Sequence, residues 1–238
     1  TIQYSFEVID TTDPYWTTAP ADKTVECDGA GNIAELNTWL AAPAGEDLCG
    51  DATVSHDFDE TDSWTQLCGG TGYYTVTFYL TDACGNQISS TKTFTIEDTT
   101  YPVWVVEPLD LTVECDGDGN TTQLNNWLTG FSGSDICGVA TVSQDFSADN
   151  FVSVCGSAGY VDVVFTLTDE CNNWIEKTAR FTVTDTTAPV WVNEPSDLTV
   201  ECDGSGNVDD FNTWLNDTFT GSDICSTASP TLSNNFTE

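Results

Sequence analysis

The segment Tyr74-Thr-Val-Thr-Phe-Tyr-Leu-Thr-Asp82 places its most apolar side chains at every second position. This period of two predicts a β-strand with one buried face and one solvent-facing side. The turn Asp82-Ala-Cys-Gly-Asn86 follows, and its Asp and Asn can bond their own backbone. A second alternating stretch around Phe94-Thr-Ile96 completes a predicted β-hairpin. The fold class that we expect is therefore all-β.

The hairpin belongs to a long sequence repeat. The boundary motif Asp10-Thr-Thr-Asp-Pro-Tyr-Trp16 returns as Asp98-Thr-Thr-Tyr-Pro-Val-Trp104 and as Asp185-Thr-Thr-Ala-Pro-Val-Trp191, after 88 and then 87 residues. This period is too long for a solenoid unit and fits one small β-domain. We expect tandem immunoglobulin-like β-sandwich repeats of about 88 residues.

Four segments follow from this period. Residues 1–9 match the ends of the other repeats, so we expect the last strand of a preceding repeat there. The chain then reads as a window onto a longer polypeptide. The expected repeats cover residues 10–97, 98–184 and, in truncated form, 185–238. Further strands are expected at residues 22–27, 52–58, 111–115 and 140–146.

One short helix is expected in each repeat. Ile33-Ala-Glu-Leu-Asn-Thr-Trp-Leu40 carries its apolar residues on one helical face, and Asn32 is the expected N-cap. Residues 121–128 and 208–215 are the counterparts. The tryptophan of each helix could stack on a sugar, but its place on the apolar stripe favours a role in pinning the helix to the sandwich; these residues are Trp39, Trp127 and Trp214.

Composition limits the partners. Four Lys and Arg residues against 39 Asp and Glu residues give a net charge of −35, which repels nucleic acid and anionic membrane surfaces and makes cations the natural partners. The 39% hydrophobic content and eight tryptophans indicate a folded chain. No apolar stretch reaches membrane length, so we expect no membrane insertion in this segment.

The ten cysteines follow the same period and predict disulfides formed in an oxidising compartment. Spacing alone allows three connectivities within a repeat of four cysteines. We favour closure of local loops, in which the first pair would clasp the helix. The expected pairs are Cys27–Cys49, Cys68–Cys84, Cys115–Cys137, Cys155–Cys171 and Cys202–Cys225.

Two kinds of acidic segment are candidate calcium sites, because calcium takes carboxylate, amide and backbone oxygens. The first is the Gly-rich loop after the first cysteine, with candidate ligands Asp28, Asp116, Asp118, Asn120 and Asp203. The alternative interpretation of this loop is a turn followed by a helix cap. The second is the repeat boundary, with candidates Asp10, Asp98 and Asp185. A simple Asp-Thr-Thr turn is the alternative there.

An enzymatic function is not expected. His56 is the single histidine of the chain, and Gln144 stands at its position in the second repeat. The sequence has no nucleophile elbow, phosphate loop or dinucleotide fingerprint. Acidic pairs such as Asp57 and Asp59 could be proposed as glycosidase carboxylates, but a solvated loop explains them better.

Several motifs together resemble a known family. The boundary Asp-Thr-Thr-x-Pro, the strand Leu111-Thr-Val-Glu-Cys-Asp-Gly117 and the turn Thr81-Asp-Ala-Cys-Gly-Asn86 are similar to the hyalin-repeat (HYR-like) domains of giant Bacteroidota surface adhesins, including those of gliding motility. The resemblance implies a non-enzymatic, extracellular filament at the bacterial surface, with calcium support. It also implies O-glycosylation at Thr11, Thr99 and Thr186.

The leading hypothesis is a structural or adhesive stalk whose partners are calcium ions, neighbouring repeats and surface glycans or other filaments. The alternative is a carbohydrate-binding or accessory module of a large secreted enzyme. A sugar site would need exposed aromatic residues, and Trp64, Tyr73 and Tyr79 are the candidates. The second repeat has no matching aromatic set.

Overall fold

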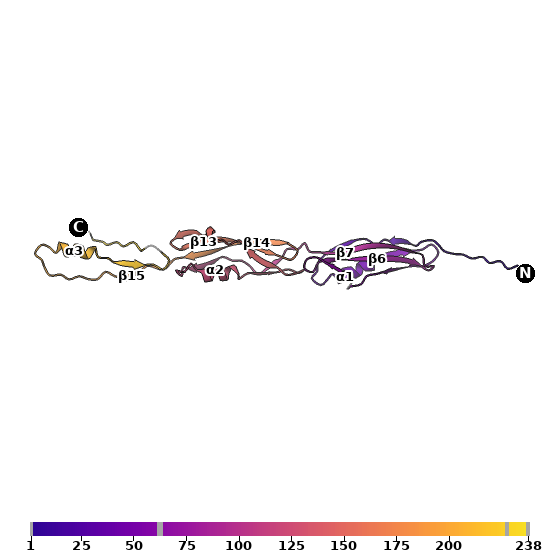
Figure 1. Ribbon diagram of the computed structural model, residues 1–238, viewed down its shortest axis with the longest axis horizontal. Helices are drawn as coiled ribbons and strands as arrows, with labels where there is room; N and C mark the ends of the chain where they lie inside the picture. Colours follow the sequence, from indigo (N-terminus) through magenta and orange to yellow (C-terminus); the bar gives the residue numbers. More distant parts are fainter. Residues whose placement is uncertain (1, 61–63, 227–228, 237–238) are drawn as a thin grey trace. The chain divides into compact units, whose positions relative to one another are not determined.

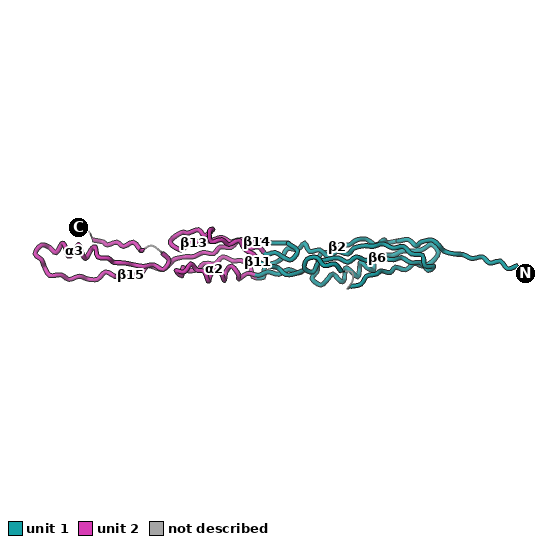
Figure 2. The backbone as a smooth tube through the Cα atoms, in the orientation of Figure 1, with its two compact units in different colours: residues 1–105, 132–142, 167–175 teal, residues 106–131, 143–166, 176–238 magenta. Residues whose placement is uncertain are grey.

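The structure, a computed structural model, describes residues 2–60, 64–226 and 229–236. The chain forms two compact units, shown in Figure 2. Unit 1 contains residues 1–105, 132–142 and 167–175, and unit 2 contains residues 106–131, 143–166 and 176–238. Two segments of the predicted second repeat, 132–142 and 167–175, therefore belong to the same unit as the whole first repeat.

The long hairpin organises unit 1 (Figure 1). Thr81 pairs with Gln87 beside the turn, and Gly72 pairs with Ile96 at the far end. The sheet order is β2-β7-β6-β4, β5 also pairs with β6, and β2 runs parallel to β7. These strands are β2 (Lys23–Glu26), β4 (Ala52–His56), β5 (Trp64–Gln66), β6 (Gly72–Asp82) and β7 (Gln87–Glu97). The predicted hairpin is confirmed.

A second, two-stranded sheet covers the hairpin in unit 1. It pairs β1 (Tyr15–Thr18) with β3 (Ala44–Glu46) in antiparallel register. A Cβ atom added to Gly45 would lie 2.2 Å from Leu80 Cδ2. The core between the layers contains Val76, Phe78, Phe94 and Ile96, none of them more than 1% exposed. The all-β sandwich class is thus confirmed.

Helix α1 (Ile33–Leu40) has the predicted bounds and lies along the hairpin (Figure 1). The Trp39 ring meets Phe78 edge-on at 5.1 Å, and its Nε1 donates a hydrogen bond to the Ala21 carbonyl at 2.7 Å. This buried position supports pinning over sugar stacking. Asn32 begins the helix with left-handed backbone angles, and its side chain makes no capping hydrogen bond. The predicted N-cap position of Asn32 is confirmed, and its side chain donates a hydrogen bond to the Glu26 carbonyl instead of capping the helix.

The second repeat uses the same elements (Figure 1). Its main sheet has the order β11-β13-β14-β9, with β12 on β13, and β8 pairs with β10. Helix α2 (Thr121–Leu128) again has the predicted bounds. The strands are β8 (Val103–Val106), β9 (Leu111–Glu114), β10 (Ser132–Ser134), β11 (Thr141–Gln144), β12 (Val152–Cys155), β13 (Ala158–Thr168) and β14 (Trp174–Thr184), with a 3-10 turn at Ala148–Asn150.

The third repeat has a strand pair and a helix. They are β15 (Val190–Asn193), β16 (Thr220–Ser222) and α3 (Val208–Leu215), which is the third helix with predicted bounds. Residues 2–9 have no strand assignment, and their apolar side chains are exposed. The predicted repeat boundaries, and the assignment of residues 1–9 to a preceding repeat, stay predictions.

Candidate functional site

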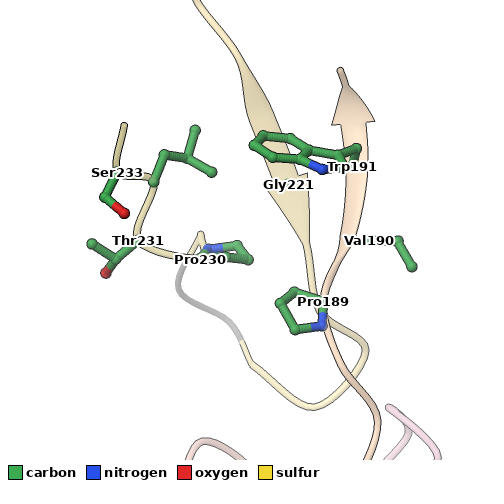
Figure 3. A pocket seen from close by; sticks show the side chains of 8 residues that line it. Pro189, Val190, Trp191, Gly221, Pro230, Thr231 and Ser233 are labelled. Atoms are coloured by element: carbon green, nitrogen blue, oxygen red, sulfur yellow. The ribbon is translucent and has the colours of Figure 1, made fainter. Parts of the chain in front are cut away.

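One hollow of the third repeat corresponds to a position that side chains of the long hairpin fill in the first two repeats. This hollow of about 290 Å³ lies beside Gly221 (Figure 3). Pro230 lies against Gly221 there, whereas Leu80 and Leu167 lie against the corresponding glycines in the first two repeats. The hollow is the place where the long hairpin packs in those repeats. Its lining comprises Pro189, Val190, Trp191, Gly221, Pro230, Thr231, Leu232 and Ser233.

The repeat boundary is the best-formed polar site in each unit. In unit 1 the Glu26 carboxylate, at the end of β2, receives three hydrogen bonds from the boundary threonines. The Thr99 and Thr100 backbone amides donate to its Oε1 at 2.7 and 3.1 Å, and the Thr99 hydroxyl donates to Oε2 at 2.9 Å. The Thr99 amide is the main cause that lowers the pKa of Glu26. This carboxylate ties the boundary to the preceding sheet.

Unit 2 repeats that arrangement at its own boundary. The Thr186 amide donates to Glu114 Oε1 at 2.7 Å, and the Thr186 and Thr187 hydroxyls both donate to this carboxylate at 3.1 Å. The Thr186 amide is again the main cause that lowers the pKa of Glu114. Sequence reasoning missed the role of both glutamates. The signal was present, because Glu precedes the first cysteine in all three repeats.

The boundary aspartates form local turns. Asp10 Oδ1 accepts the Thr12 amide at 3.0 Å, and Asp98 Oδ1 accepts the Thr100 amide at 3.2 Å and its hydroxyl at 2.7 Å. Asp185 Oδ1 accepts the Thr187 amide at 3.2 Å. These are the Asx turns of the alternative interpretation.

Each boundary aspartate also meets a second aspartate. Three groups have ligand atoms within 4.8 Å of one another, and they are Asp10, Asp47 and Cys49; Asp98, Asp135 and Cys137; and Asp185, Asp223 and Cys225. The first two groups lie in unit 1 and the third in unit 2. The sequence analysis identified the boundary aspartates but missed their partners. The repeated Asp-x-Cys motif at 47–49, 135–137 and 223–225 was the available signal.

The chemistry of these groups is that of a paired carboxylate. Asp135 Oδ2 accepts the Cys137 amide at 2.7 Å, and Asp47 Oδ2 accepts the Cys49 amide at 2.7 Å. Asp47 Oδ1 is buried without a hydrogen-bond partner. The Cys137 and Cys225 sulfurs are in disulfides, which leaves carboxylate oxygens as the donors of those two groups. Hard oxygen donors with uncompensated negative charge fit calcium better than a thiolate-preferring metal.

The Gly-rich loops direct their carboxylates inward. Asp28 Oδ1 accepts the Ala30 and Asn32 amides at 2.7 and 3.0 Å, and the Asn32 side chain donates to the Glu26 carbonyl at 2.8 Å. The backbone bond from Asn32 is the main cause that lowers the pKa of Asp28. Asp116 with Asn120, and Asp203 with Asn207, repeat this pattern.

The turn interpretation thus explains the bonding of these loops. Among the described residues, none of the predicted loop ligands joins a cluster of three metal-ligating side chains. These predicted ligands are Asp28, Asp116, Asp118, Asn120 and Asp203. Calcium binding at the loops stays a prediction. The predicted glycosylation residues Thr11, Thr99 and Thr186 are all exposed.

The disulfides differ from every pair that local closure predicts. Cys27 is bonded to Cys137 and Cys68 to Cys171, both within unit 1, with Cα atoms 6.0 and 5.2 Å apart. Within unit 2, Cys115 is bonded to Cys225 at 5.9 Å. The expected pairs Cys27–Cys49, Cys68–Cys84, Cys115–Cys137, Cys155–Cys171 and Cys202–Cys225 are therefore wrong. Each observed bond joins cysteines of successive sequence repeats.

Strand length is the physical reason. Cys68 precedes β6 and Cys84 follows it, so eleven strand residues separate them, or about 35 Å at 3.3 Å per residue. Cysteines with Cα atoms more than about 7 Å apart cannot be bridged. Cys27 lies at the Glu97 end of the same sheet, where its amide donates to the Glu97 carbonyl at 2.8 Å.

Close backbone contacts accompany the bonds. Gly69 has φ +51°, and a Cβ atom there would lie 2.2 Å from the Cys137 carbonyl oxygen. Gly156 has φ +55°, and a Cβ atom there would lie 2.4 Å from the Cys225 carbonyl oxygen. Both the backbone angle and the space require glycine after Cys68, which is bonded, and after Cys155, which is free.

Comparisons with known proteins show general likenesses. No protein-family model and no curated protein matches the sequence. The chain resembles Drosophila N-cadherin EC1-4 at 13% identity and TM-score 0.31, covering 73% of this chain and 50% of that one. It resembles human CDH23 EC21-23 at 14% identity and TM-score 0.31, covering 80% of this chain and 77% of that one. It resembles the tandem Ig repeats of Dlar at 11% identity and TM-score 0.22, covering 72% of this chain and 98% of that one.

This chain spans half the length of the N-cadherin segment. No helix in the described part of the chain is long and apolar enough to cross a membrane.

Proposed function

We propose that this chain is a non-enzymatic, load-bearing segment of an extracellular repeat protein of the hyalin-repeat type, a cell-surface stalk or adhesive filament of the kind found in Bacteroidota. The observation that carries the proposal is the bonding of successive repeats by Cys27–Cys137, Cys68–Cys171 and Cys115–Cys225. A bond within a repeat would strengthen that repeat alone. Bonds between repeats instead limit how far the chain extends when one repeat opens, because Cys27–Cys137 bypasses the chain between two cysteines that are 110 residues apart in sequence.

Electrostatics and chemistry support an extracellular setting. Disulfides persist in oxidising compartments. The net charge of −35 keeps a long strand soluble and repels similar strands. Glu26 and Glu114, which we call the glutamate clasps, hold the boundaries at Asp98 and Asp185 by hydrogen bonds from the boundary threonines.

Calcium is the proposed cation of the boundaries. The pairs Asp98 with Asp135 and Asp185 with Asp223 are the proposed ligands, since each offers carboxylate oxygens at a repeat boundary. Asp10 with Asp47 is the equivalent pair in the first repeat. Calcium there would neutralise two carboxylates and stiffen the boundary. O-glycosylation at Thr11, Thr99 and Thr186 is proposed on the resemblance alone.

The load-bearing role is tested by holding the oxidised chain under constant force. The test variant is Cys27→Ser with Cys137→Ser, and the matched control is Cys49→Ser with Cys84→Ser, which removes two free, exposed cysteines. A disulfide is worth about 2–4 kcal/mol, so the test variant should shorten the lifetime of the folded state by at least about tenfold. The control should not change it. Equal lifetimes for all three chains would contradict the proposal.

A further inference from the structure

The three disulfides follow one rule across the repeats. The first cysteine of a repeat bonds the second cysteine of the next repeat, as in Cys27–Cys137 and Cys115–Cys225. The third cysteine bonds the fourth cysteine of the next repeat, as in Cys68–Cys171. The four cysteines left over are free and exposed, and they are Cys49, Cys84, Cys155 and Cys202.

By this rule, each free cysteine would form a bond with a cysteine of the preceding or the following repeat. Cys49 and Cys84 are the second and fourth cysteines of the first repeat, so they need a first and a third cysteine. Cys155 is a third cysteine and needs a fourth. Cys202 is a first cysteine and needs a second. No free cysteine falls outside the rule.

The backbone supports the same register where the sulfur is still free. The Gly70 amide, two residues after Cys68, donates to the Cys137 carbonyl in unit 1. In unit 2 the Ser157 amide, two residues after Cys155, donates to the Cys225 carbonyl at 2.8 Å. The loop of the third cysteine is therefore seated against the next repeat in both cases, although only Cys68 has its partner.

An uncovered, extended segment of the sequence pattern of a last strand lies at the same end of the first repeat as Cys49 and Cys84. Residues 2–9 precede Asp10, whose carbonyl accepts a hydrogen bond from Asn86 in the turn beside Cys84. Phe6 and Val8 are 93% and 79% exposed. Their sequence counterparts are buried core residues of the long hairpins, namely Phe94, Ile96, Phe181 and Val183.

We propose that another repeat of the same sequence pattern binds at this end, where its first and third cysteines form disulfides with Cys49 and Cys84 and its sheet takes residues 2–9 as the last strand. Each bond joins two thiols, which lose two protons and two electrons. A disulfide oxidant accepts the electrons and is reduced to two thiols. The proposal concerns covalent assembly and holds independently of the load-bearing function.

A bond between Cys49 and Cys84 is the competing outcome. The second repeat argues against it, because Cys137 and Cys171 occupy the equivalent positions. Those two cysteines bond Cys27 and Cys68 of the first repeat and not each other.

The test supplies the proposed repeat. A copy of residues 98–175 is fused before Thr1 of the full chain, so that residues 2–9 follow its turn in the register of β14. The copy contains no Lys or Arg, so trypsin leaves it joined to residues 1–23 in one N-terminal peptide. The chain is refolded with oxidised glutathione, alkylated under denaturing conditions and digested without reduction.

The N-terminal peptide should then stay linked to peptide 24–92 through the copied Cys115 with Cys49 and the copied Cys155 with Cys84. Alkylation of Cys49 and Cys84, complete in the original chain, should be lost. Release of a free N-terminal peptide, with Cys49 and Cys84 still alkylated and the three native bonds intact, would overturn the proposal. So would a bond between Cys49 and Cys84.

Two matched variants of the copy control for position. Replacing its Cys115 and Cys155 with serine should abolish the link, and replacing its Cys137 and Cys171 with serine should leave the link intact. A second fusion tests the same rule at the other end, so that the test does not depend on the folding of the first fusion. It carries a copy of residues 63–97 appended after Glu238. There Cys155 should lose its alkylation by bonding the copied Cys84, and a Cys155 that remains fully alkylated would overturn the rule.

Discussion

Cys27 at the end of β2 is bonded to Cys137 in the loop after β10, across 110 residues of sequence. In the chain-entropy model, closure of a loop this long stabilises the folded state by about 5 kcal/mol, compared with about 3 kcal/mol for a loop of some twenty residues. The observed pairing thus gives more stability per bond than local pairing would. It also makes the folding of one repeat depend on the next.

The glutamate clasp predicts an acid-sensitive boundary. Because hydrogen bonds from Thr99 lower the pKa of Glu26 below its ordinary value of 4.5, the clasp stabilises the fold fully above that value. Its contribution is lost as the pH falls through the lowered pKa. Glu26→Gln should therefore lower the melting temperature at pH 7 and flatten its fall below pH 4.5.

Thermal unfolding between pH 7 and pH 3 measures this effect. Glu35→Gln, on the exposed side of α1, is the control and should follow the original chain. A Glu26→Gln variant with the same pH profile as the original chain would contradict the clasp.

The glycine beside the bonded cysteine predicts a difference between two otherwise similar substitutions. Gly69→Ala combines a left-handed φ with a contact of 2.2 Å to the Cys137 carbonyl, whereas Gly85→Ala has φ +93° and nothing within 4 Å. Backbone strain alone costs on the order of 1–3 kcal/mol. Gly69→Ala should therefore lose more unfolding free energy than Gly85→Ala in denaturant titrations. Equal losses would show that the close contact is absent in solution.

The paired carboxylates predict a calcium effect located at the boundary. Calcium bound only to the folded state raises the melting temperature by mass action, and EDTA reverses this. Asp98→Asn with Asp135→Asn should reduce the calcium-dependent rise. Asp116→Asn, in the Gly-rich loop, should leave it unchanged. If the Asp116 variant loses the rise and the boundary variant keeps it, calcium binds the loop instead.

The reactivity of Cys49 provides a separate test of the first boundary. The negative charge of Asp10 is the main cause that raises the pKa of the Cys49 thiol, with Asp47 adding to it. The thiolate is the reactive form, so Cys49 should alkylate slowly at pH 8 and low salt. Asp10→Asn should speed its alkylation, and added salt should do the same by screening. An unchanged rate in the variant would place Asp10 away from the thiol.

Local periodicity was sufficient to predict part of the fold. The helices Ile33–Leu40, Thr121–Leu128 and Val208–Leu215 and the hairpin of β6 and β7 match their predicted positions, because each pattern is repeated and strongly amphipathic. Short strands such as β3 (Ala44–Glu46) were not predictable. Three residues with a central glycine show no alternation, and the pairing with β1 forms only in the folded chain.

The sequence itself contained a reason against the predicted Cys68–Cys84 bond. The predicted strand over Tyr74-Thr-Val-Thr-Phe-Tyr-Leu-Thr-Asp82 already separates Cys68 from Cys84 by about 30 Å. Closure of a local loop between Cys68 and Cys84 is incompatible with this separation. The candidate site was also predictable only in part. The boundary aspartates could be identified because their motif is repeated. Asp135, the partner of Asp98, was missed because only the fold brings the two carboxylates together.

The pairing of successive repeats is tested most directly by tryptic digestion without reduction. Lys23, Lys92, Lys177 and Arg180 are the four cleavage positions, so every cysteine falls in peptide 24–92, 93–177 or 181–238. The chain is alkylated under denaturing conditions and then digested. The observed bonds predict that all three peptides remain one linked species until reductant is added, with Cys49, Cys84, Cys155 and Cys202 alkylated. Three separate peptides would mean bonds within repeats and would contradict this account.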